Sequence, residues 1–121
     1  MRLTKLELEL MDFFWKLGEV SVREVHEAIP ARRRPAFTTV QTIVQRLEQK
    51  GALRRTRKVG NALLFEPSVT RKSVYRRLID DFLQLFGGDS DPLVAHLVET
   101  GRLKLSDLAN AEKLTRKGKA K

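Results

Sequence analysis

The side chains of this 121-residue sequence that could do chemistry are mostly cations, and they gather in one quarter of the chain. Residues 31–60 hold nine lysines and arginines and one acid, Glu48, a net charge of +8 out of +9 for the whole chain. A field concentrated in this way suits a polyanion, and the phosphate backbone of a duplex is the commonest one. The nine cations are Arg32, Arg33, Arg34, Arg46, Lys50, Arg54, Arg55, Arg57 and Lys58.

Residues 39–50 combine part of this charge with a polar surface. Apolar residues recur there with helical spacing, at Val40, Ile43, Val44 and Leu47. On a helix with 100° per residue these four form one face, and the opposite face consists of Thr38, Thr42, Gln45 and Gln49, flanked by Thr39 and Arg46. Hydroxyl, amide and guanidinium groups bond to base edges and phosphates. We therefore predict base contacts for Thr42 and Gln45, and a phosphate or guanine contact for Arg46.

Each of these predictions has a plainer alternative. A helix face can simply be solvated, but such faces usually mix Glu with Lys, and this one has no acid at its centre. The triple arginine of residues 32–34 could clamp phosphates or form a solvated loop, and the sequence leaves both open.

Three capping boxes mark the elements that would position these groups. In a capping box, Ser or Thr is followed three residues later by Glu or Gln, and the two side chains satisfy free amides at a helix N-terminus. The predicted helices cover residues 5–17, 22–28 and 39–50. The boxes are Thr4 with Glu7, Ser21 with Glu24, and Thr38 with Gln41.

A β-hairpin is predicted next, with strands at residues 52–57 and 62–66 around a Val59-Gly60-Asn61 tip. Three helices followed by a hairpin are the order of a winged helix-turn-helix domain, in which the hairpin is the wing. On a two-residue period Arg55 and Arg57 share one face, and Arg54 and Lys58 share the other. Together with Asn61 they could reach the DNA backbone or a minor groove, or they could protect an edge strand from aggregation.

The rest of the chain predicts a second, all-helical unit over residues 70–115. Thr70, Asp91 (before Pro92) and Ser106 are the expected helix caps. Lone short amphipathic helices are marginal in water, so this unit is expected to dimerise. Residues 1–69 would then be the DNA-binding domain, and residues 116–121 a disordered basic tail. The expected dimer residues are Val74, Leu78, Phe82, Phe86, Leu93, Leu97 and Leu108.

Several functions are excluded by composition. The chain has no cysteine, so a disulfide, a thiolate nucleophile or a zinc finger is impossible. His26 and His96 are isolated, which favours structural roles, and no nucleophile, base, cofactor or metal set can be assembled, so an enzyme is not expected. No apolar run is long enough to enter a membrane, and a cytoplasmic location is expected.

The sequence resembles the BlaI/MecI/CopY family of bacterial repressors over most of its length. The matching motifs are Leu3-Thr4 with Glu7, Trp15-Lys16-Leu17-Gly18, Val22 to Val25, Thr38 to Thr42 with Arg46-Leu47 and Lys50-Gly51, Phe65-Glu66-Pro67, Phe86-Gly87-Gly88, and Leu93 to Glu99.

The resemblance implies an N-terminal winged helix, a recognition helix at residues 38–50 and a C-terminal helical domain that forms homodimers. Such proteins repress transcription from near-palindromic operators. Some are inactivated by a membrane protease sensor that cuts an Asn-Phe bond. Here His96-Leu97 occupies that position, so such a sensor stays an open alternative. Copper-sensing members use C-terminal cysteines, which this chain lacks.

Two other classes of binding protein remain as alternatives. A nucleoid-type or RNA-binding architectural protein would bind unrelated duplexes equally well. A protein-interaction module built on a winged helix would expose an apolar patch where residues 38–50 show a polar, basic face.

Overall fold

The computed structural model describes residues 2–119, including all side chains in that range except those of residues 105 and 116–119. The chain divides into two compact units, Met1–Leu78 and Ile79–Lys121. The division falls inside a helix, α4 (Arg71–Gln84), and not at the end of the wing.

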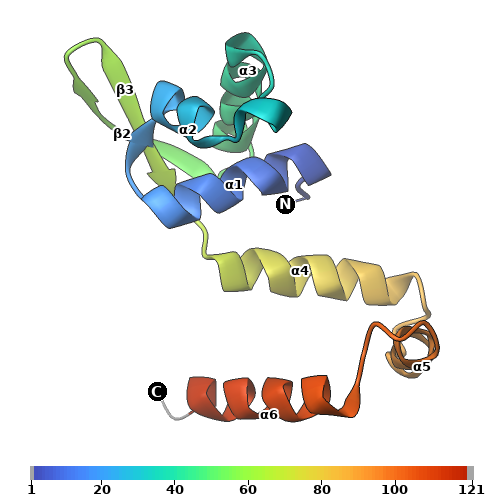
Figure 1. The fold of residues 1–121 in the computed structure, drawn as a ribbon. Coiled ribbons are helices and arrows are strands. Elements are labelled where there is room, and N and C mark those ends of the chain that lie inside the picture. The colour runs from blue at the N-terminus through green and yellow to red at the C-terminus, as the bar shows by residue number, and fades with distance from the viewer. Residues whose placement is uncertain (1, 120–121) are drawn as a thin grey trace. The chain divides into compact units, whose positions relative to one another are not determined.

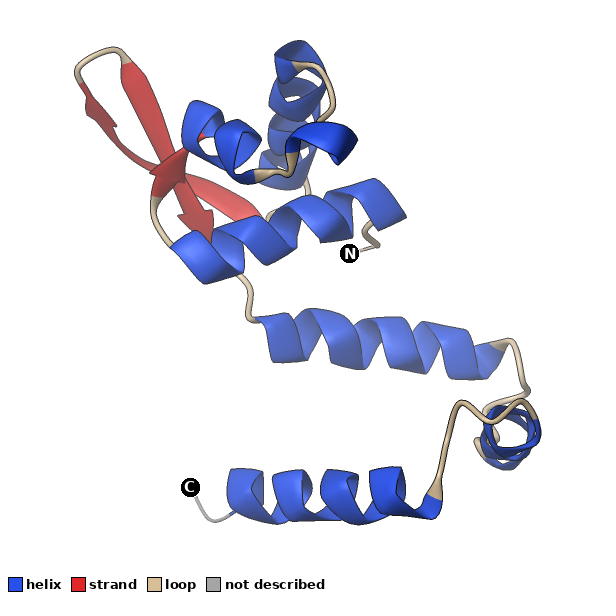
Figure 2. Cartoon of the chain, in the orientation of Figure 1, coloured by secondary structure: helices blue, strands red, loops and turns tan. Residues whose placement is uncertain are grey.

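The first unit is a winged helix, which confirms the predicted fold class (Figures 1 and 2). Three helices and a short 3-10 turn are followed by a hairpin, and a two-residue strand joins the hairpin to make a small sheet. Its elements are α1 (Lys5–Leu17), β1 (Val20–Ser21), α2 (Val22–Ala28), η1 (Ala31–Arg33), α3 (Phe37–Gln49), β2 (Leu53–Val59) and β3 (Ala62–Pro67).

The first two helices begin at the predicted capping boxes. Thr4 Oγ1 accepts a hydrogen bond from Glu7 N at 3.2 Å, and Glu7 Oε1 accepts one from Thr4 N at 2.8 Å. Ser21 and Glu24 repeat the arrangement at 3.2 and 3.1 Å. Both bounds match the prediction because each box satisfies amides that have no partner inside the helix.

The third predicted capping box is wrong. α3 begins at Phe37, and Ala36 stands at the cap position without a side-chain hydrogen bond. His26 explains the earlier start, because its Nε2 donates to Pro35 O at 2.9 Å and its ring meets Phe37 edge-on at 5.4 Å. These contacts extend the helix by one half-turn, so Thr38 lies inside it and not at its cap.

The core forms where α1, α2 and α3 meet. The predicted apolar face of α3 is buried, and its four residues Val40, Ile43, Val44 and Leu47 are at most 4 % exposed. They join Leu10, Phe14 and Val25 of the other two helices in one hydrophobic cluster. Burial of this face determines which face of α3 is left for solvent.

The sheet has the order β1-β3-β2, with both pairs antiparallel. The sequence did not predict β1, because a strand of two residues has no detectable periodicity. The predicted hairpin tip is confirmed: Gly60 has φ 60° and Asn61 a negative φ, the pattern of a type II′ turn. The register shifts between Arg55 and Lys58, so the alternation predicted for the wing does not continue past Arg55.

The first half of α4 packs on α1. Trp15 Nε1 donates to Val69 O at 3.0 Å, and the Trp15 ring meets the Tyr75 ring edge-on at 6.1 Å. The Arg71 guanidinium lies 5.3 Å from the centroid of the Trp15 ring. These contacts explain why the first unit continues beyond residue 69, where the sequence analysis placed the domain boundary.

The second unit contains the end of α4 together with α5 (Asp91–Glu99) and α6 (Leu105–Lys119). Thr70 caps α4 as predicted, accepting from Ser73 N at 3.1 Å. The other two predicted caps are wrong by one or two positions. Ser90 occupies the cap of α5, and Lys104 precedes α6, where Asp107 accepts from its amide at 2.9 Å. Carboxylates bind free amides there, as in the capping boxes.

The predicted disordered tail is corrected in part. α6 continues through residues 116–119, which the prediction assigned to the tail. Three of these four residues are lysine or arginine, which are good helix formers. Residues 120 and 121 lie outside the described part of the chain.

One charged side chain of α1 is buried. Glu7 is 2 % exposed, and its Oε1 receives Lys50 Nζ at 2.6 Å. Burial raises the pKa of Glu7, but hydrogen bonds from Lys50 and Thr4 outweigh that effect and hold the pKa below its ordinary value of 4.5. The carboxylate therefore stabilises the fold above the pKa that it has in the unfolded chain.

We predict that this stability is lost as the pH falls from about 4.5 through the lowered pKa of folded Glu7. Glu7→Gln should be less stable at neutral pH and lose less on acidification in that window. Urea unfolding between pH 7 and pH 3 measures both effects. An unchanged pH dependence in Glu7→Gln would contradict the assignment.

Candidate nucleic-acid interface

The outward face of α3 is polar, and among its described side chains it is free of acid at its centre. The predicted residues Thr38, Thr39, Thr42, Gln45 and Arg46 are all exposed, opposite the buried stripe. The hydroxyl of Thr42 donates to Thr38 O at 3.0 Å, which leaves its oxygen free to accept. The Gln45 amide and the Arg46 guanidinium make no hydrogen bond within the described residues. The geometry therefore brings the candidate base-reading groups together on one surface.

A groove of about 650 Å³ separates this face from the wing. Gln45 lines it from α3, and Arg55 and Asn61 line it from the hairpin. Two exposed polar residues of the groove, Arg23 and Gln41, were missed by the sequence-based prediction. Gln41 was assigned to a capping box, although its position four residues before Gln45 places both on one helix face.

The wing arginines are engaged within the protein. Each has an acidic partner outside its own strand. One ion pair lies across the hairpin, and the other two tie the wing to the rest of the domain. Arg54 Nε donates to Glu66 at 2.8 Å, Arg55 Nε to Glu48 at 2.7 Å, and Arg57 Nε to Glu19 at 3.1 Å. The Arg55–Glu48 pair joins the wing to α3. Pairs this exposed contribute little stability, roughly 0–1 kcal/mol each, but they orient the side chains.

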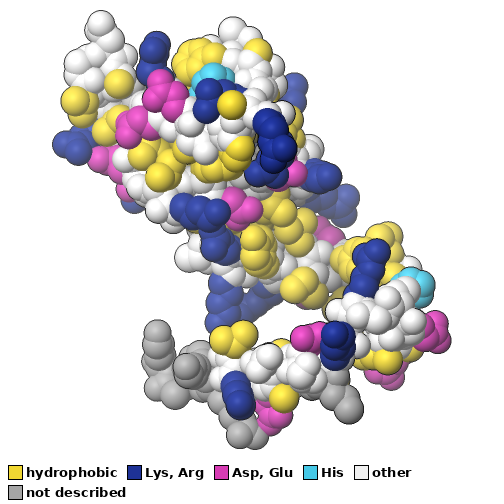
Figure 3. Space-filling model, in the orientation of Figure 1, with side chains coloured by type: hydrophobic (Ala, Val, Ile, Leu, Met, Phe, Trp, Pro, Cys, Tyr) yellow, Lys and Arg dark blue, Asp and Glu magenta, His cyan; other side chains and the backbone are white. Residues whose placement is uncertain are grey.

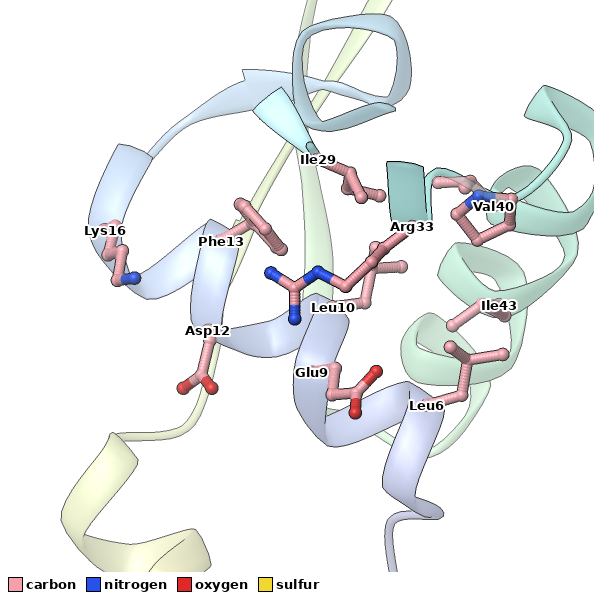
Figure 4. Close-up of a pocket in the computed structure, with 11 residues that line it drawn as sticks. Leu6, Glu9, Leu10, Asp12, Phe13, Lys16, Ile29, Arg33, Val40 and Ile43 are labelled. Atoms are coloured by element: carbon pink, nitrogen blue, oxygen red, sulfur yellow. The ribbon is translucent and has the colours of Figure 1, made fainter. Parts of the chain in front are cut away.

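The three consecutive arginines at residues 32–34 have different surroundings. Arg34 closes the C-terminus of α2, donating to Ile29 O at 3.0 Å and to Glu27 O at 2.9 Å. Arg33 lines a pocket of about 220 Å³ with Glu9 and Asp12, and its guanidinium points toward α1 (Figure 4). Arg32 is exposed. The structure thus separates three residues that are adjacent in the sequence.

Lys50 also has a role inside the protein. Its Nζ donates to Glu7 and, at 2.8 Å, to Arg2 O. Of the nine cations in residues 31–60, four make no side-chain hydrogen bond or ion pair within residues 2–119. These four, the unpaired cations, are Arg32, Arg33, Arg46 and Lys58.

Other kinds of site find no support in the described part of the chain. No group of three or more His, Asp or Glu side chains there could hold a metal ion. None of the described helices has the length and apolar character needed to cross a membrane.

A winged helix with a polar, cationic α3 beside its wing is the architecture of a DNA-binding transcription regulator. The family model described as "Penicillinase repressor" matches residues 3–117. A transcriptional regulator BlaI of Mycobacterium tuberculosis is 37 % identical over 101 residues, covering 81 % of this chain and 72 % of the relative. A penicillinase repressor of Bacillus licheniformis is 26 % identical over 103 residues, covering 84 % and 80 %.

Solved structures agree with this fold. The DNA-binding domain of the repressor BlaI matches 58 % of this chain and 84 % of its own length, with a TM-score of 0.52 and 28 % identity. The reduced form of MarR from Escherichia coli matches 95 % of this chain and 76 % of its own, with a TM-score of 0.54 and 16 % identity, which shows the fold alone.

The chain belongs to the penicillinase repressor family. It is a DNA-binding transcriptional repressor and not an enzyme, as the sequence predicted.

The unpaired cations should dominate the salt dependence of DNA binding. Each phosphate contact contributes about 0.9 to the slope of log K against log salt for B-DNA. We predict that Arg46→Gln and Lys58→Gln each flatten the slope by about that amount. Arg54→Gln should change it by less than half as much, because Arg54 already has Glu66 as its partner. Fluorescence anisotropy over a salt series measures the slopes, and equal changes in all three variants would contradict the distinction.

Proposed function

We propose that this repressor binds a dyad-symmetric operator as a homodimer and thereby blocks transcription. In each protomer α3 would enter the major groove, and the wing would reach the adjacent backbone or minor groove. A twofold protein requires half-sites about one turn, roughly 34 Å, or a small multiple apart. The proposal places the protein in the cytoplasm, with the DNA.

One observation carries the DNA-binding part of this proposal. The buried stripe and the acid-free polar face lie on opposite sides of α3, so the helix can stay packed on the core while it presents its polar groups. A helix face that is merely solvated has no need to be free of acids. A face that docks another protein would expose an apolar patch.

We assign roles from the exposed groups. Thr42 and Gln45 read bases, because hydroxyl and amide groups discriminate base edges in the major groove. Arg46 binds phosphate or guanine. The remaining contacts position the protein on the DNA backbone and come from Arg32, Thr38, Thr39, Lys58 and Asn61.

The homodimer is proposed because the second unit lacks a core of its own. After Val74, the last buried residue, every described side chain is at least partly exposed to solvent. Hydrophobic side chains remain open on the surface of the C-terminal unit (Figure 3). A second copy would cover them. The exposed large apolar residues there are Ile79, Phe82, Leu85, Phe86, Val94, Val98, Leu108 and Leu114.

This surface differs in part from the predicted dimer residues. Phe82, Phe86 and Leu108 are exposed and remain candidates. Leu78, Leu93 and Leu97 are half-buried. Val74 is left out of the proposed surface, because it is only 8 % exposed and therefore already covered by its own chain.

A membrane protease sensor stays an open alternative for relief of repression. The His96-Leu97 bond lies inside α5, so cleavage there would require the helix to unwind first.

Selection of bound duplexes from a random DNA pool tests the proposed function. We expect a dyad-symmetric motif bound by a species of twice the monomer mass. Gln45→Ala should relax preference at one base position by about 1–3 kcal/mol, since an unread base pair loses its discrimination.

Gln49→Ala is the matched control, because Gln49 is an exposed glutamine at the end of α3 without an assigned base contact. Equal enrichment of all sequences, with salt-sensitive binding to each, would instead indicate an architectural protein with little sequence preference.

Phe82→Asp tests the dimer surface. A carboxylate at this position removes apolar area from the dimer interface, and burying its charge carries a desolvation penalty. We therefore expect monomers and weaker operator binding. Sedimentation velocity measures the mass. Gln84→Asp adds the same charge to an exposed position on the same helix and should remain dimeric. A fully dimeric Phe82→Asp protein would refute this surface.

A further inference from the structure

An ion pair between a buried acid and a partly exposed lysine connects the end of α3 to the start of α1. Lys50 is the C-terminal cap of α3, and its Nζ lies 2.6 Å from Glu7 Oε1. The same oxygen accepts from Thr4 N, inside the capping box that begins α1. Lys50 Nζ also donates to Arg2 O, in the segment before α1. One lysine therefore joins two points of the N-terminal segment, Arg2 and Glu7, to the helix that is proposed to read DNA.

The pair adds little net stability, because burying the Glu7 carboxylate costs solvation free energy. Glu7 is almost completely buried, and its second oxygen, Oε2, has no hydrogen-bond partner among the described residues. Apolar side chains of similar size often stabilise a protein as much as a buried ion pair or more. Because only Glu7 is buried, the pair forms only when Lys50 Nζ reaches its oxygen, which favours one arrangement of the two helices.

Core packing alone does not fix the crossing angle and the axial position of α3, and such a pair can restrict both. Its buried stripe sets which face of the helix turns inward, but helix–helix packing permits a range of crossing angles and small shifts along the axis. Lys50 holds the C-terminal end of α3, one turn after Arg46, to a second helix. This contact then limits the tilt and the axial shift that the packing of α3 leaves open.

We propose that Lys50 and Glu7 are positioning residues, which set the pose of α3 against the bases, and that Lys50 is not a phosphate contact. The inference rests on the proposed function, in which α3 reads operator bases. It replaces the phosphate-binding role that the sequence suggested for Lys50.

The sign of the charge change separates the two roles. Glu7→Gln makes the protein more positive by one unit and releases Lys50 from its partner. If charge alone mattered, affinity for every duplex would rise. If the pair positions α3, affinity for the selected operator falls relative to other sequences, although the protein has become more cationic.

The test uses full-length variants and two duplexes of equal length and composition, one carrying the motif selected by the wild-type protein and one scrambled. The variants are Glu7→Gln, Lys50→Gln, the double variant and the control Glu9→Gln, which makes the same charge change at an exposed position on α1. Affinities are measured over a salt series, at a temperature where thermal unfolding shows each variant to be folded.

We expect both single variants to lower the ratio of the two affinities about tenfold, the size of one lost base contact. The double variant should be no worse than either single variant, because residues that act as a pair are not additive. Salt slopes and the Glu9→Gln ratio should stay at the wild-type values.

Three results would overturn the proposal. Lys50→Gln could weaken both duplexes equally and flatten the salt slope by about 0.9, which identifies a phosphate contact. Folded variants could keep the wild-type ratio despite lower melting temperatures, which identifies a purely structural pair. A wild-type protein that prefers neither duplex would refute the proposed function itself, and the inference with it.

Lys50→Arg covers the case in which the glutamine variants fail to fold. It keeps the charge but replaces the compact ammonium group of lysine by the planar guanidinium group of arginine. A lower affinity ratio at an unchanged salt slope would support positioning. An unchanged ratio would count against it, since only the charge would then matter.

Discussion

The buried face of α3 is the constraint on which the rest of the structure depends. Val40, Ile43, Val44 and Leu47 cannot leave the core without exposing the apolar surface that holds three helices together. Because a helix has a fixed number of residues per turn, their burial also fixes the direction of Thr42 and Gln45. Stability and presentation of the polar face are thus consequences of one packing arrangement.

Charge in this domain has two different uses. The wing arginines, Arg34 and Lys50 are bonded within the chain, to carboxylates or to backbone carbonyls. They orient the wing, the loop before α3 and the end of α3. Arg46 and Lys58 lack such partners among the described residues and can meet phosphate without breaking an existing bond. Net charge attracts DNA at a distance, whereas the local partners decide which cations are free to touch it.

The second unit lacks the kind of core that stabilises the first. The winged helix buries a hydrophobic cluster of its own, but the described side chains after Val74 remain at least partly open to solvent. Short helices without a packed face gain too little to offset the entropy of ordering them. In the proposed homodimer a second copy would supply the missing apolar surface, and dimerisation and the ordering of this unit would then be one event.

The sequence by itself determined the elements whose signals are local. Capping boxes at Thr4 and Ser21 predicted two helix starts, the spacing of Val40 to Leu47 predicted the buried face of α3, and Gly60 predicted the hairpin turn. The winged-helix order followed from these.

Only the tertiary structure decided what depends on contacts between distant residues. His26 and Pro35 moved the start of α3, and β1 exists because Val20 pairs with Phe65. Lys50 meets Glu7 across 43 positions, and Arg57 meets Glu19 across 38. A sequence pattern records what a side chain is and which face of its own helix it shares. It does not record the partner that folding brings to it, and that partner separates a free cation from one already bound.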